Sequence, residues 1–411
     1  MKFSEHIVSN YKPKNLAVKL SSKGEQHVIK KHPWVFSNSI EKISNEPKTG
    51  DLAIIFSKKR NKVVGIGLYD ADSPIRIKVI HNENEKATIN AEFFQTKIET
   101  AYNKRQKLLE TNTNSYRLIF GENDGFPSLI ADVYASVLVV KLYSEIWLPF
   151  LQDILQSLQQ VSKAKTVVIR LSRNVEKSTN HNLKDGEVVY GILEDEVVQF
   201  VEHNVNFSAN VIKGHKTGYF LDHRANRKRV GELSKGKHVL DVFSYAGGFS
   251  VHALYNQAKE VTSLDISKQA LQIAVENGKL NNYSGVHKTI AGDAFEELRK
   301  LIQQKVKFDV VVIDPPSFAK QASEIDLAEK KYKQLAKLGV QLTAKNGLLV
   351  LASCSSRVVA ETFFSINEET LKASKRRFKI DAKTYHDIDH PIGFPEGAYL
   401  KCGYYQFIEK S

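Results

Sequence analysis

Residues 237–265, KHVLDVFSYAGGFSVHALYNQAKEVTSLD, constrain the fold more than any other part of the chain. An apolar strand ending at Asp241 runs into a turn with Gly247 and Gly248, a helix follows, and a second strand ends at Asp265. Glycines in such a turn let backbone N–H groups approach a ligand, and an acid ending the second strand can accept hydrogen bonds from both ribose hydroxyls. Because glycine is also common in tight turns that bind nothing, the pattern needs support from elsewhere. It predicts half of a nucleotide-binding α/β unit.

The turn reads SYAGGFS and lacks the GxGxxG pattern that cradles a pyrophosphate, so an adenosine ligand without phosphates fits better. The stretch resembles the first motif of class I methyltransferases, which bind S-adenosylmethionine. Two later stretches agree with this resemblance: IAGDAFEEL (290–298) places Asp293 after a third strand, and FDVVVIDPPSF (308–318) is a buried strand that ends in Asp314. The resemblance implies a cofactor site that includes Asp241, Ser244, Gly247, Gly248, Asp265, Ile266, Asp293, Ala294 and Asp314.

The length, the residue composition and the net charge of the chain exclude several classes of protein. A chain of 411 residues is too long for one ordinary core, so two or three domains are expected. No stretch approaches the length of an uncharged membrane span, and the N-terminus has no apolar signal region, which predicts a cytoplasmic protein with no membrane partner. The two cysteines, Cys354 and Cys402, cannot build a disulfide framework or a zinc site. The formal charge of +13 favours a polyanionic partner such as RNA.

We predict an α/β fold with three domains: 1–80, 81–190 and 191–411. Short alternating runs such as LAVKL, DLAIIF and IRIKVI indicate a small, mostly antiparallel barrel over 1–80. The HPWVFSNSIEKI segment with the runs that follow it resembles a PUA domain, an RNA-binding β-barrel. The resemblance implies phosphate contacts from basic side chains that would otherwise be an ordinary solvated surface, namely Lys30, Lys31, Lys58, Lys59, Arg60 and Lys62.

The middle domain reads as an α+β unit. Helical spacing indicates a helix over about 86–112, with Phe93 and Phe94 in the core, and a second helix near 146–161. Strands are predicted within 116–144 and over 166–171, and the polar stretch 173–187 reads as a loop or linker. The segment 198–233 is expected to form a hairpin and then begin a helix at HRANRKRV. The C-terminal domain is predicted to be a Rossmann-like class I methyltransferase domain.

The segment KTGYFLDHRANR (216–227) resembles the TGxFLDxRxNR signature of a bacterial family that joins a PUA domain to a class I catalytic domain. The match is to the large-subunit rRNA cytosine-5 methyltransferases. By that resemblance, Phe220, Asp222 and Arg224 lie beside the cofactor. A planar guanidinium such as that of Arg224 suits bidentate pairing with the methionine carboxylate. The same residues would also suit a helix N-terminus with a basic surface.

Cys354 ends the apolar run GLLVLASC, at the position of the fifth strand of a class I sheet. A lone cysteine after a buried strand is usually a small core residue, as we expect for Cys402 in its late strand. The carboxyl end of a fifth strand, however, faces the same crevice as Gly247 and Asp314. Methylation of carbon 5 of a pyrimidine requires a thiolate to add at carbon 6, whereas nitrogen methylation needs no cysteine. Cys354 is therefore the predicted nucleophile.

Asp314 and the two prolines after it supply the second catalytic element. A DPP turn holds backbone carbonyls rigidly, because proline fixes φ and has no N–H donor. We expect Asp314 to contact N3 and the amine of a cytosine, Pro315 and Pro316 to shape the substrate site, and Phe318 to stack on the base. Many RNA cytosine-5 methyltransferases carry a second cysteine in this turn, and its absence here leaves the base for the carbon-5 proton unassigned. Asp314 is a candidate.

Three alternatives stay open. The DPPSF turn resembles that of amino-methyltransferases, so the enzyme could methylate an exocyclic amine or guanine N7. A uracil-5 methyltransferase shares the cysteine chemistry but usually has Asn-Pro after it, where Ser355 and Ser356 stand here. The last alternative is an inactive RNA-binding assembly factor. No metal is expected, and a homodimer is left open.

Overall fold

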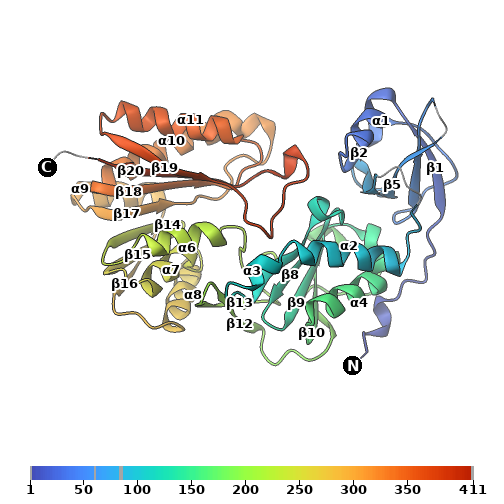
Figure 1. Ribbon diagram of the computed structural model, residues 1–411, viewed down its shortest axis with the longest axis horizontal. Coiled ribbons are helices and arrows are strands. Elements are labelled where there is room, and N and C mark those ends of the chain that lie inside the picture. The colour runs from blue at the N-terminus through green and yellow to red at the C-terminus, as the bar shows by residue number, and fades with distance from the viewer. Residues whose placement is uncertain (1, 60–61, 83–86, 409–411) are drawn as a thin grey trace. The chain divides into compact units, whose positions relative to one another are not determined.

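The structure is a computed structural model that describes residues 2–59, 62–82 and 87–408. The chain divides into two compact units (Figure 1). The first unit comprises Met1–Val201, Ser208–Leu221 and Ile388–Gly397, and the second comprises Glu202–Phe207, Asp222–Asp387 and Ala398–Ser411. The finer division with boundaries near 80 and 190 stays a prediction. Among the described residues, no helix has both the length and the apolar character that crossing a membrane requires.

The N-terminal part of the first unit is a six-stranded sheet in the order β2-β6-β5-β4-β1-β3. Its described pairs are antiparallel except for β1 with β4, which agrees with the predicted, mostly antiparallel barrel. The strands are β1 (Asn15–Leu20), β2 (Trp34–Phe36), β3 (Ile40–Ile43), β4 (Leu52–Phe56), β5 (Val63–Tyr69) and β6 (Ile75–His81). The short helix α1 (Ser22–Ile29) begins where the Ser21 side chain accepts a hydrogen bond from the Gly24 N–H.

The basic residues predicted to meet phosphates lie on the surface of this sheet and its turns. Five of them are exposed: Lys30, Lys31, Lys58, Lys59 and Lys62. Arg60 lies outside the described residues.

The rest of the first unit is a five-stranded sheet in the order β11-β10-β9-β8-β7. Its strands are β7 (Ser115–Phe120), β8 (Leu129–Tyr134), β9 (Val137–Leu142), β10 (Thr166–Leu171) and β11 (Glu187–Tyr190). Helices α2 (Ala91–Asn103) and α4 (Leu151–Ser162) pack with this sheet in one apolar core that contains Phe94 and Trp147. Phe94 is fully buried in that core, as predicted, whereas Phe93 is half-buried and packs against its edge.

Two expectations for this region need correction. The helix predicted over about 86–112 is interrupted after α2 and resumes as α3 (Gln106–Leu109), while residue 86 lies outside the described residues. Arg105, between the two helices, turns its buried guanidinium inward to Asp124, which a straight surface helix would not require. The stretch 173–187, read as a loop, contains the short helix α5 (Arg173–Glu176), which the Ser172 side chain caps.

The chain then forms a hairpin of β12 (Val197–Glu202) and β13 (Val205–Asn210), as predicted. Beyond it, the second unit is built on a seven-stranded sheet in the order β16-β15-β14-β17-β18-β20-β19 (Figure 1). Its strands are β14 (His238–Val242), β15 (Glu260–Asp265), β16 (Val286–Ala291), β17 (Phe308–Ile313), β18 (Thr343–Ser353), β19 (Phe378–Thr384) and β20 (Lys401–Phe407). The first five in this order are parallel, and β20 runs antiparallel to its neighbours.

The strand order positions the functional site. From β14 the chain moves outward through β15 to β16, and it then returns to place β17 on the other side of β14. Ligands of open α/β sheets bind at such a switch point, outside the carboxyl ends of the strands. A ligand is therefore expected at the carboxyl ends of β14, β17 and β18.

Helices cover both faces of this sheet. Leu240 and Val242 of β14 share a core cluster with residues of α9, α10 and α11, whereas Val239 packs with residues of α6 and α7. Alternation of neighbouring side chains between two faces is the normal consequence of strand geometry. Cys402 of β20 is fully buried and packs in this core, as its assignment to packing requires. The helices are α6 (Arg224–Glu232), α7 (Gly248–Tyr255), α8 (Lys268–Lys279), α9 (Ala294–Gln303), α10 (Ile325–Leu342) and α11 (Ala360–Ala373).

Candidate active site at the carboxyl ends of β14, β17 and β18

Three ionisable side chains meet where β17 and β18 end. Asp314 follows β17, Cys354 follows β18, and His223 directly precedes α6. The Nε2 atom of His223 lies 3.4 Å from the Sγ atom of Cys354 and 3.3 Å from the Oδ1 atom of Asp314. Sγ and Oδ1 are 3.9 Å apart. Ile313 and Leu351 are paired on neighbouring parallel strands. Asp314 lies one residue beyond that pair and Cys354 three residues beyond it, which explains their proximity.

Two members of this cluster, Cys354 and Asp314, are predicted from the sequence, and the third, His223, is not. Cys354 and Asp314 both follow strands of the same sheet, so their proximity could be inferred from strand order. His223 lies within the TGYFLDHRANR segment, between two residues assigned to the cofactor, yet no role was given to it. Its position directly before a predicted helix that leads into β14 was the available signal.

The environment of His223 is buried and charged. Burial alone lowers the pKa of His223, but the carboxylate of Asp314 raises it by charge and hydrogen bonding, and the net shift is upward. Asp222 adds to the rise and Arg227 opposes it. The side chain of Phe249 contacts the imidazole edge to face, with ring centroids 5.6 Å apart. The imidazole is thus held at one position beside the thiol.

A polar chain behind His223 orients the ring. The Nδ2 atom of Asn226 donates to Nδ1 of His223 at 3.1 Å. The Oδ1 atom of the same amide accepts hydrogen bonds from Thr384 Oγ1 at 2.6 Å and from the Tyr404 hydroxyl at 2.9 Å. In the structure both hydroxyls face the amide oxygen, and the amide nitrogen faces the imidazole.

Next to this cluster, the turn after β14 has an unusual backbone. Phe243 and Tyr245 have φ angles of 64° and 47°, in the left-handed region that residues with a side chain seldom adopt. Gly247 follows with a φ of 78°. Left-handed residues with bulky side chains cost free energy and concentrate at ligand-binding and catalytic sites. The turn therefore has the kind of backbone that is found at ligand-binding sites.

Asp241 lies beneath this turn and is almost completely buried. Its Oδ2 atom accepts hydrogen bonds from the N–H and the hydroxyl of Ser250 at 3.0 and 2.7 Å. Burial raises the pKa of Asp241 to about 7, against the lowering effect of those two donors. Within the described part of the chain, its Oδ1 atom has no hydrogen-bond partner, and the same holds for the buried hydroxyl of Ser244. Buried polar atoms without partners suit a site that a polar ligand completes.

The end of β15 has the features expected of a nucleoside site. Asp265 accepts hydrogen bonds from Tyr245 N at 2.9 Å and Ser267 N at 2.9 Å, one on each carboxylate oxygen, so both oxygens are held in place. The next residue, Ile266, is 74% exposed although it is apolar. An exposed apolar side chain beside a braced carboxylate can cover the face of a base while the carboxylate binds the ribose hydroxyls.

The other predicted cofactor residues occupy varied positions. Asp293 is exposed and caps α9, where it accepts from Glu296 N, while Ala294 is buried in the core beside it. Asp222 accepts a hydrogen bond from the Tyr399 hydroxyl at 2.9 Å. Gly248 begins α7. Phe220 belongs to the first unit, where the Lys216 ammonium lies 4.7 Å from its ring centre.

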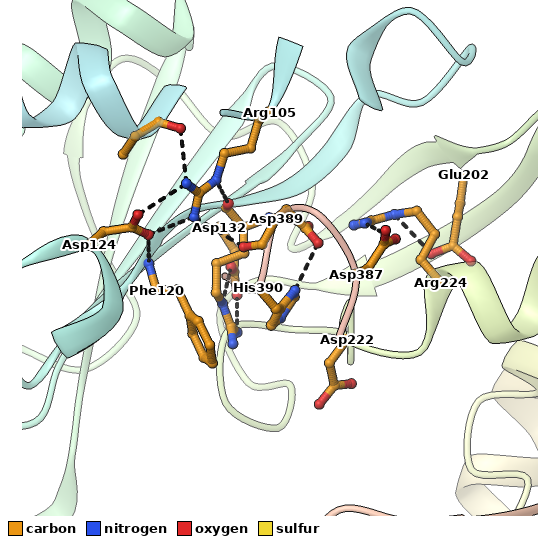
Figure 2. A network of polar contacts seen from close by, with 12 residues as sticks. Arg105, Phe120, Asp124, Asp132, Glu202, Asp222, Arg224, Asp387, Asp389 and His390 are labelled. Atoms are coloured by element: carbon orange, nitrogen blue, oxygen red, sulfur yellow. Dashed lines mark hydrogen bonds and ion pairs between the residues drawn. The ribbon is translucent and has the colours of Figure 1, made fainter. Parts of the chain in front are cut away.

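Arg224 is completely buried and already has acidic partners (Figure 2). Its Nη1 atom lies 3.2 Å from Asp387 Oδ2, and its Nε atom lies 3.9 Å from Glu202 Oε2. Glu202 also binds Arg227 at 2.6 Å and His252 at 2.9 Å, and these partners outweigh burial to hold its pKa far below the usual range. Pairing of Arg224 with the methionine carboxylate stays a prediction, and these acids would compete with it.

The DPP turn combines a buried and an exposed proline. Pro315 is buried and Pro316 is exposed after Asp314. Phe318 lies half-buried against the core, with its ring centre 5.3 Å from that of Tyr332 and the Lys331 ammonium 4.9 Å away. These are packing contacts, and stacking of Phe318 on a base stays a prediction.

A separate network of buried ion pairs lies within the first unit (Figure 2). Arg105 pairs with Asp124 at 2.6 Å and donates to the backbone carbonyl of Asp389 at 3.1 Å. One carboxylate oxygen of Asp389 accepts from the Arg117 N–H, and the other lies 2.8 Å from Nδ1 of His390. The segment Ile388–Gly397 is thereby attached to the five-stranded sheet.

Comparison with known proteins agrees with this fold. The model of the S-adenosylmethionine-dependent methyltransferase family matches residues 116–395, and that of the PUA-like domain matches residues 18–82. A methyltransferase structure from Streptococcus mutans superposes with a TM-score of 0.79 at 20% identity, covering 95% of this chain and 99% of that one. A second methyltransferase structure, in complex with SAH, also has a TM-score of 0.79 at 20% identity, covering 96% of this chain and 100% of that one. The chain is therefore an S-adenosylmethionine-dependent methyltransferase with a PUA-like domain.

Sequence relatives define the family more narrowly. A Deinococcus radiodurans protein named ribosomal RNA large subunit methyltransferase is 39% identical over 398 residues, which span 95% of this chain and 97% of that protein. Ribosomal RNA large subunit methyltransferase I of Aeromonas hydrophila is 34% identical over 383 residues, which span 92% and 96%. This chain belongs to the family that contains these proteins. The predicted family, the predicted fold class and the predicted cofactor, S-adenosylmethionine, are confirmed.

Proposed function

We propose that this enzyme transfers a methyl group from S-adenosylmethionine to carbon 5 of a cytosine in large-subunit ribosomal RNA. The names of the relatives support the RNA, and the placement of a cysteine thiol beside an aspartate at the strand ends supports the chemistry. The observation that carries the proposal is the half-buried Cys354, whose Sγ atom lies within 3.9 Å of both Asp314 and His223.

The cofactor supplies an electrophilic methyl group on a sulfonium. The residues proposed to hold it fit such a group, because Asp241 and Ser244 each leave a buried oxygen without a partner among the described residues and Asp265 is braced beside exposed Ile266. The remaining residues proposed for the cofactor are Phe220, Asp222, Arg224, Gly247, Gly248, Asp293, Ala294 and Asp314.

The role of Cys354 follows from the low nucleophilicity of carbon 5. The thiolate adds to carbon 6, so that electron density moves onto carbon 5, which then accepts the methyl group. Loss of the carbon-5 proton and elimination of the thiolate restore the aromatic ring and free the enzyme. Asp314 is proposed to contact N3 and the exocyclic amine of the cytosine, with Pro315, Pro316 and Phe318 around the ring.

The target base has to leave its stack to reach the carboxyl ends of the strands. We therefore assign RNA binding to the PUA-like domain over 1–80 and the α+β domain over 81–190, and catalysis to residues 191–411. The exposed lysines of the six-stranded sheet suit phosphate contacts, which position an RNA without reading its bases.

Nitrogen methylation is the second candidate, because the Asp314-Pro315-Pro316-Ser317-Phe318 turn also resembles that of amino-methyltransferases. Nucleoside mass spectrometry separates the two functions. Ribosomal RNA from cells that lack the gene is compared after complementation with wild type, Cys354→Ala, or the matched control Cys402→Ala. We expect one 5-methylcytosine to be absent from cells that lack the gene. Wild type and Cys402→Ala should restore it, and Cys354→Ala should not. Restoration of 5-methylcytosine by Cys354→Ala would overturn the thiolate mechanism, and loss of a methylated guanine or amine instead would establish nitrogen methylation.

A further inference from the structure

We propose that His223 is a catalytic hydrogen-bond donor, whose Nε2–H holds the Cys354 side chain as the thiolate that attacks the pyrimidine. This inference rests on the proposed function for the identity of the thiolate's target. The thiolate itself is a property of the free enzyme, so it is testable without RNA or cofactor.

The polar chain behind the imidazole determines which of its nitrogens carries the proton. Asn226 Nδ2 donates to His223 Nδ1 at 3.1 Å, because the oxygen of that amide faces the hydroxyls of Thr384 and Tyr404. A ring nitrogen that accepts a hydrogen bond carries no proton, so the proton of neutral His223 is on Nε2. Nε2 is the atom that faces Cys354.

The Nε2–H group has two acceptors within reach, Asp314 Oδ1 at 3.3 Å and Cys354 Sγ at 3.4 Å. While the thiol is protonated, its S–H can donate to Oδ1 at 3.9 Å. When that proton moves, the S–H bond breaks, its electron pair stays on sulfur, and an O–H bond forms on Asp314. The Nε2–H group then donates to the new anion on sulfur. A charge-assisted hydrogen bond of this kind is about twice as strong as a neutral one.

The same donor serves both ends of the reaction. As the sulfur pair forms the bond to carbon 6, the hydrogen bond from Nε2 weakens, and when that bond breaks the pair returns to sulfur and the hydrogen bond is restored. His223 keeps its proton throughout. The carbon-5 proton therefore needs a different acceptor, and Asp314 can serve as that acceptor once it has released the thiol proton to solvent.

A nearby hydrogen-bond donor matters here because the acidic groups around the thiol oppose an anion on sulfur. Asp314 at the end of β17 and Asp222 before α6 are acidic, and the Tyr332 hydroxyl on α10 is also close enough to interact with the cysteine. Two cations are nearby. Arg227 is paired with Glu202, and Lys401 donates its ammonium hydrogens to the carbonyls of Ser355 and Tyr399. Burial lowers the pKa of Lys401 to about 8, although the charge on Cys354 raises it.

Alkylation by iodoacetamide as a function of pH tests the inference on the free full-length enzyme. Cys402 is fully buried, so Cys354 is the reactive thiol, and a Cys402→Ala background verifies this. We expect the wild-type midpoint to lie about one pH unit or more below about 8.5, the ordinary pKa of a thiol. His223→Asn, which removes the Nε2 donor, should move the midpoint upward and slow alkylation about tenfold near neutral pH. His223→Gln, whose amide N–H reaches nearly the same position, should restore most of the reactivity.

The matched control is His238→Gln, because His238 begins β14 at the end of the strand opposite the site. Should His223→Asn fail to fold, the ultraviolet absorbance difference between wild type and Cys354→Ala still reports the thiolate. A midpoint at or above the ordinary thiol value in wild type, or equal midpoints in wild type and His223→Asn, would overturn the inference.

These outcomes are separable from those of the proposed function. If wild type forms 5-methylcytosine while His223→Asn leaves the alkylation profile unchanged, the role of His223 is wrong and the function stands. If the profile shifts as expected but the product is a nitrogen-methylated base, the thiolate is real and the cytosine chemistry is wrong.

Discussion

The buried ammonium group of Lys401 donates a hydrogen bond to the backbone carbonyl of Ser355, the residue after Cys354. It also donates to the carbonyl of Tyr399 at 3.1 Å. Strand β20 therefore holds the turn that carries the proposed nucleophile, although β20 and this turn are separated by more than forty residues in sequence. Because both residues are buried, the Lys401 ammonium and the Ser355 carbonyl each depend on this hydrogen bond to offset the loss of water.

Replacing Lys401 by methionine should destabilise the protein and slow methylation. Methionine fills a similar volume but leaves the carbonyl of buried Ser355 and that of half-buried Tyr399 without this donor, which costs about 1–3 kcal/mol of unfolding free energy. Urea unfolding measures the loss, and a methylation assay measures the effect of freeing the turn. Lys279→Met is the control, because Lys279 is an exposed member of a surface pair with Glu276 and should change stability by less than about 0.5 kcal/mol. Equal unfolding free energies for both variants would contradict the structural role.

Asp241 should make the stability of the free enzyme depend on pH. Its pKa is about 7 in the folded protein, against about 3.9 in an unfolded chain, so the folded state binds more protons between these values. Stability is therefore highest below the unfolded pKa and falls as pH rises toward about 7. Asp241→Asn removes this loss, and its stability relative to wild type should improve on the order of 2 kcal/mol between about pH 5 and about pH 8.

Urea unfolding at both pH values measures this difference. Cys402→Ala is a suitable control, since burial raises the pKa of that thiol far above the range used and the cavity cost should be the same at both pH values. A relative stability of Asp241→Asn that does not change with pH would show that Asp241 is ionised throughout.

The sequence was sufficient where the chemistry is local and insufficient where it depends on distant segments. Apolar runs ending in Asp241, Asp265 and Asp314 identified three strands and their order, because a strand and the acid after it are consecutive in sequence. The resemblance to class I methyltransferases makes the strand before Cys354 the fifth of the sheet, which placed Cys354 and Asp314 at the same crevice.

The role of His223 was not accessible in the same way. Its contact with Cys354 requires the start of α6 to lie at the ends of β17 and β18, and its orientation depends on Thr384 and Tyr404, far along the chain. Burial of Arg224 against Asp387 is a further example, because a run of basic residues at a helix start resembles a solvated surface.

Asp265 should contribute strongly to cofactor affinity. Both of its oxygens are braced by backbone N–H groups, so the carboxylate is preorganised to accept hydrogen bonds from the ribose. Asp265→Ala should weaken S-adenosylmethionine binding about tenfold or more, since a hydrogen bond to a charged group contributes about 1.5–3 kcal/mol. Isothermal titration calorimetry gives the dissociation constant. Glu260→Ala, at the other end of β15 and paired with Lys288, should bind like wild type, and an equal loss in both variants would count against a ribose contact.

The exposed lysines of the six-stranded sheet should set the salt dependence of RNA binding. Each phosphate contact releases counterions, so the slope of log affinity against log salt falls by about 0.7–0.9 for each contact removed. A variant with Lys30, Lys31, Lys58, Lys59 and Lys62 all changed to glutamine should therefore bind ribosomal RNA fragments more weakly and with a shallower slope. Its fold is checked by thermal unfolding, because these side chains are exposed and their loss should alter stability little.

The control for this experiment changes Lys279 and Lys300 to glutamine. Both are exposed on helices of the second unit and pair with glutamates three residues earlier, so removing them lowers the net charge without touching the proposed RNA contacts. Fluorescence anisotropy at several salt concentrations gives the slopes. Identical slopes for wild type and the five-lysine variant would show that these lysines do not contact the RNA phosphates. A reduced slope in the control as well would indicate that net charge, rather than these positions, attracts the RNA.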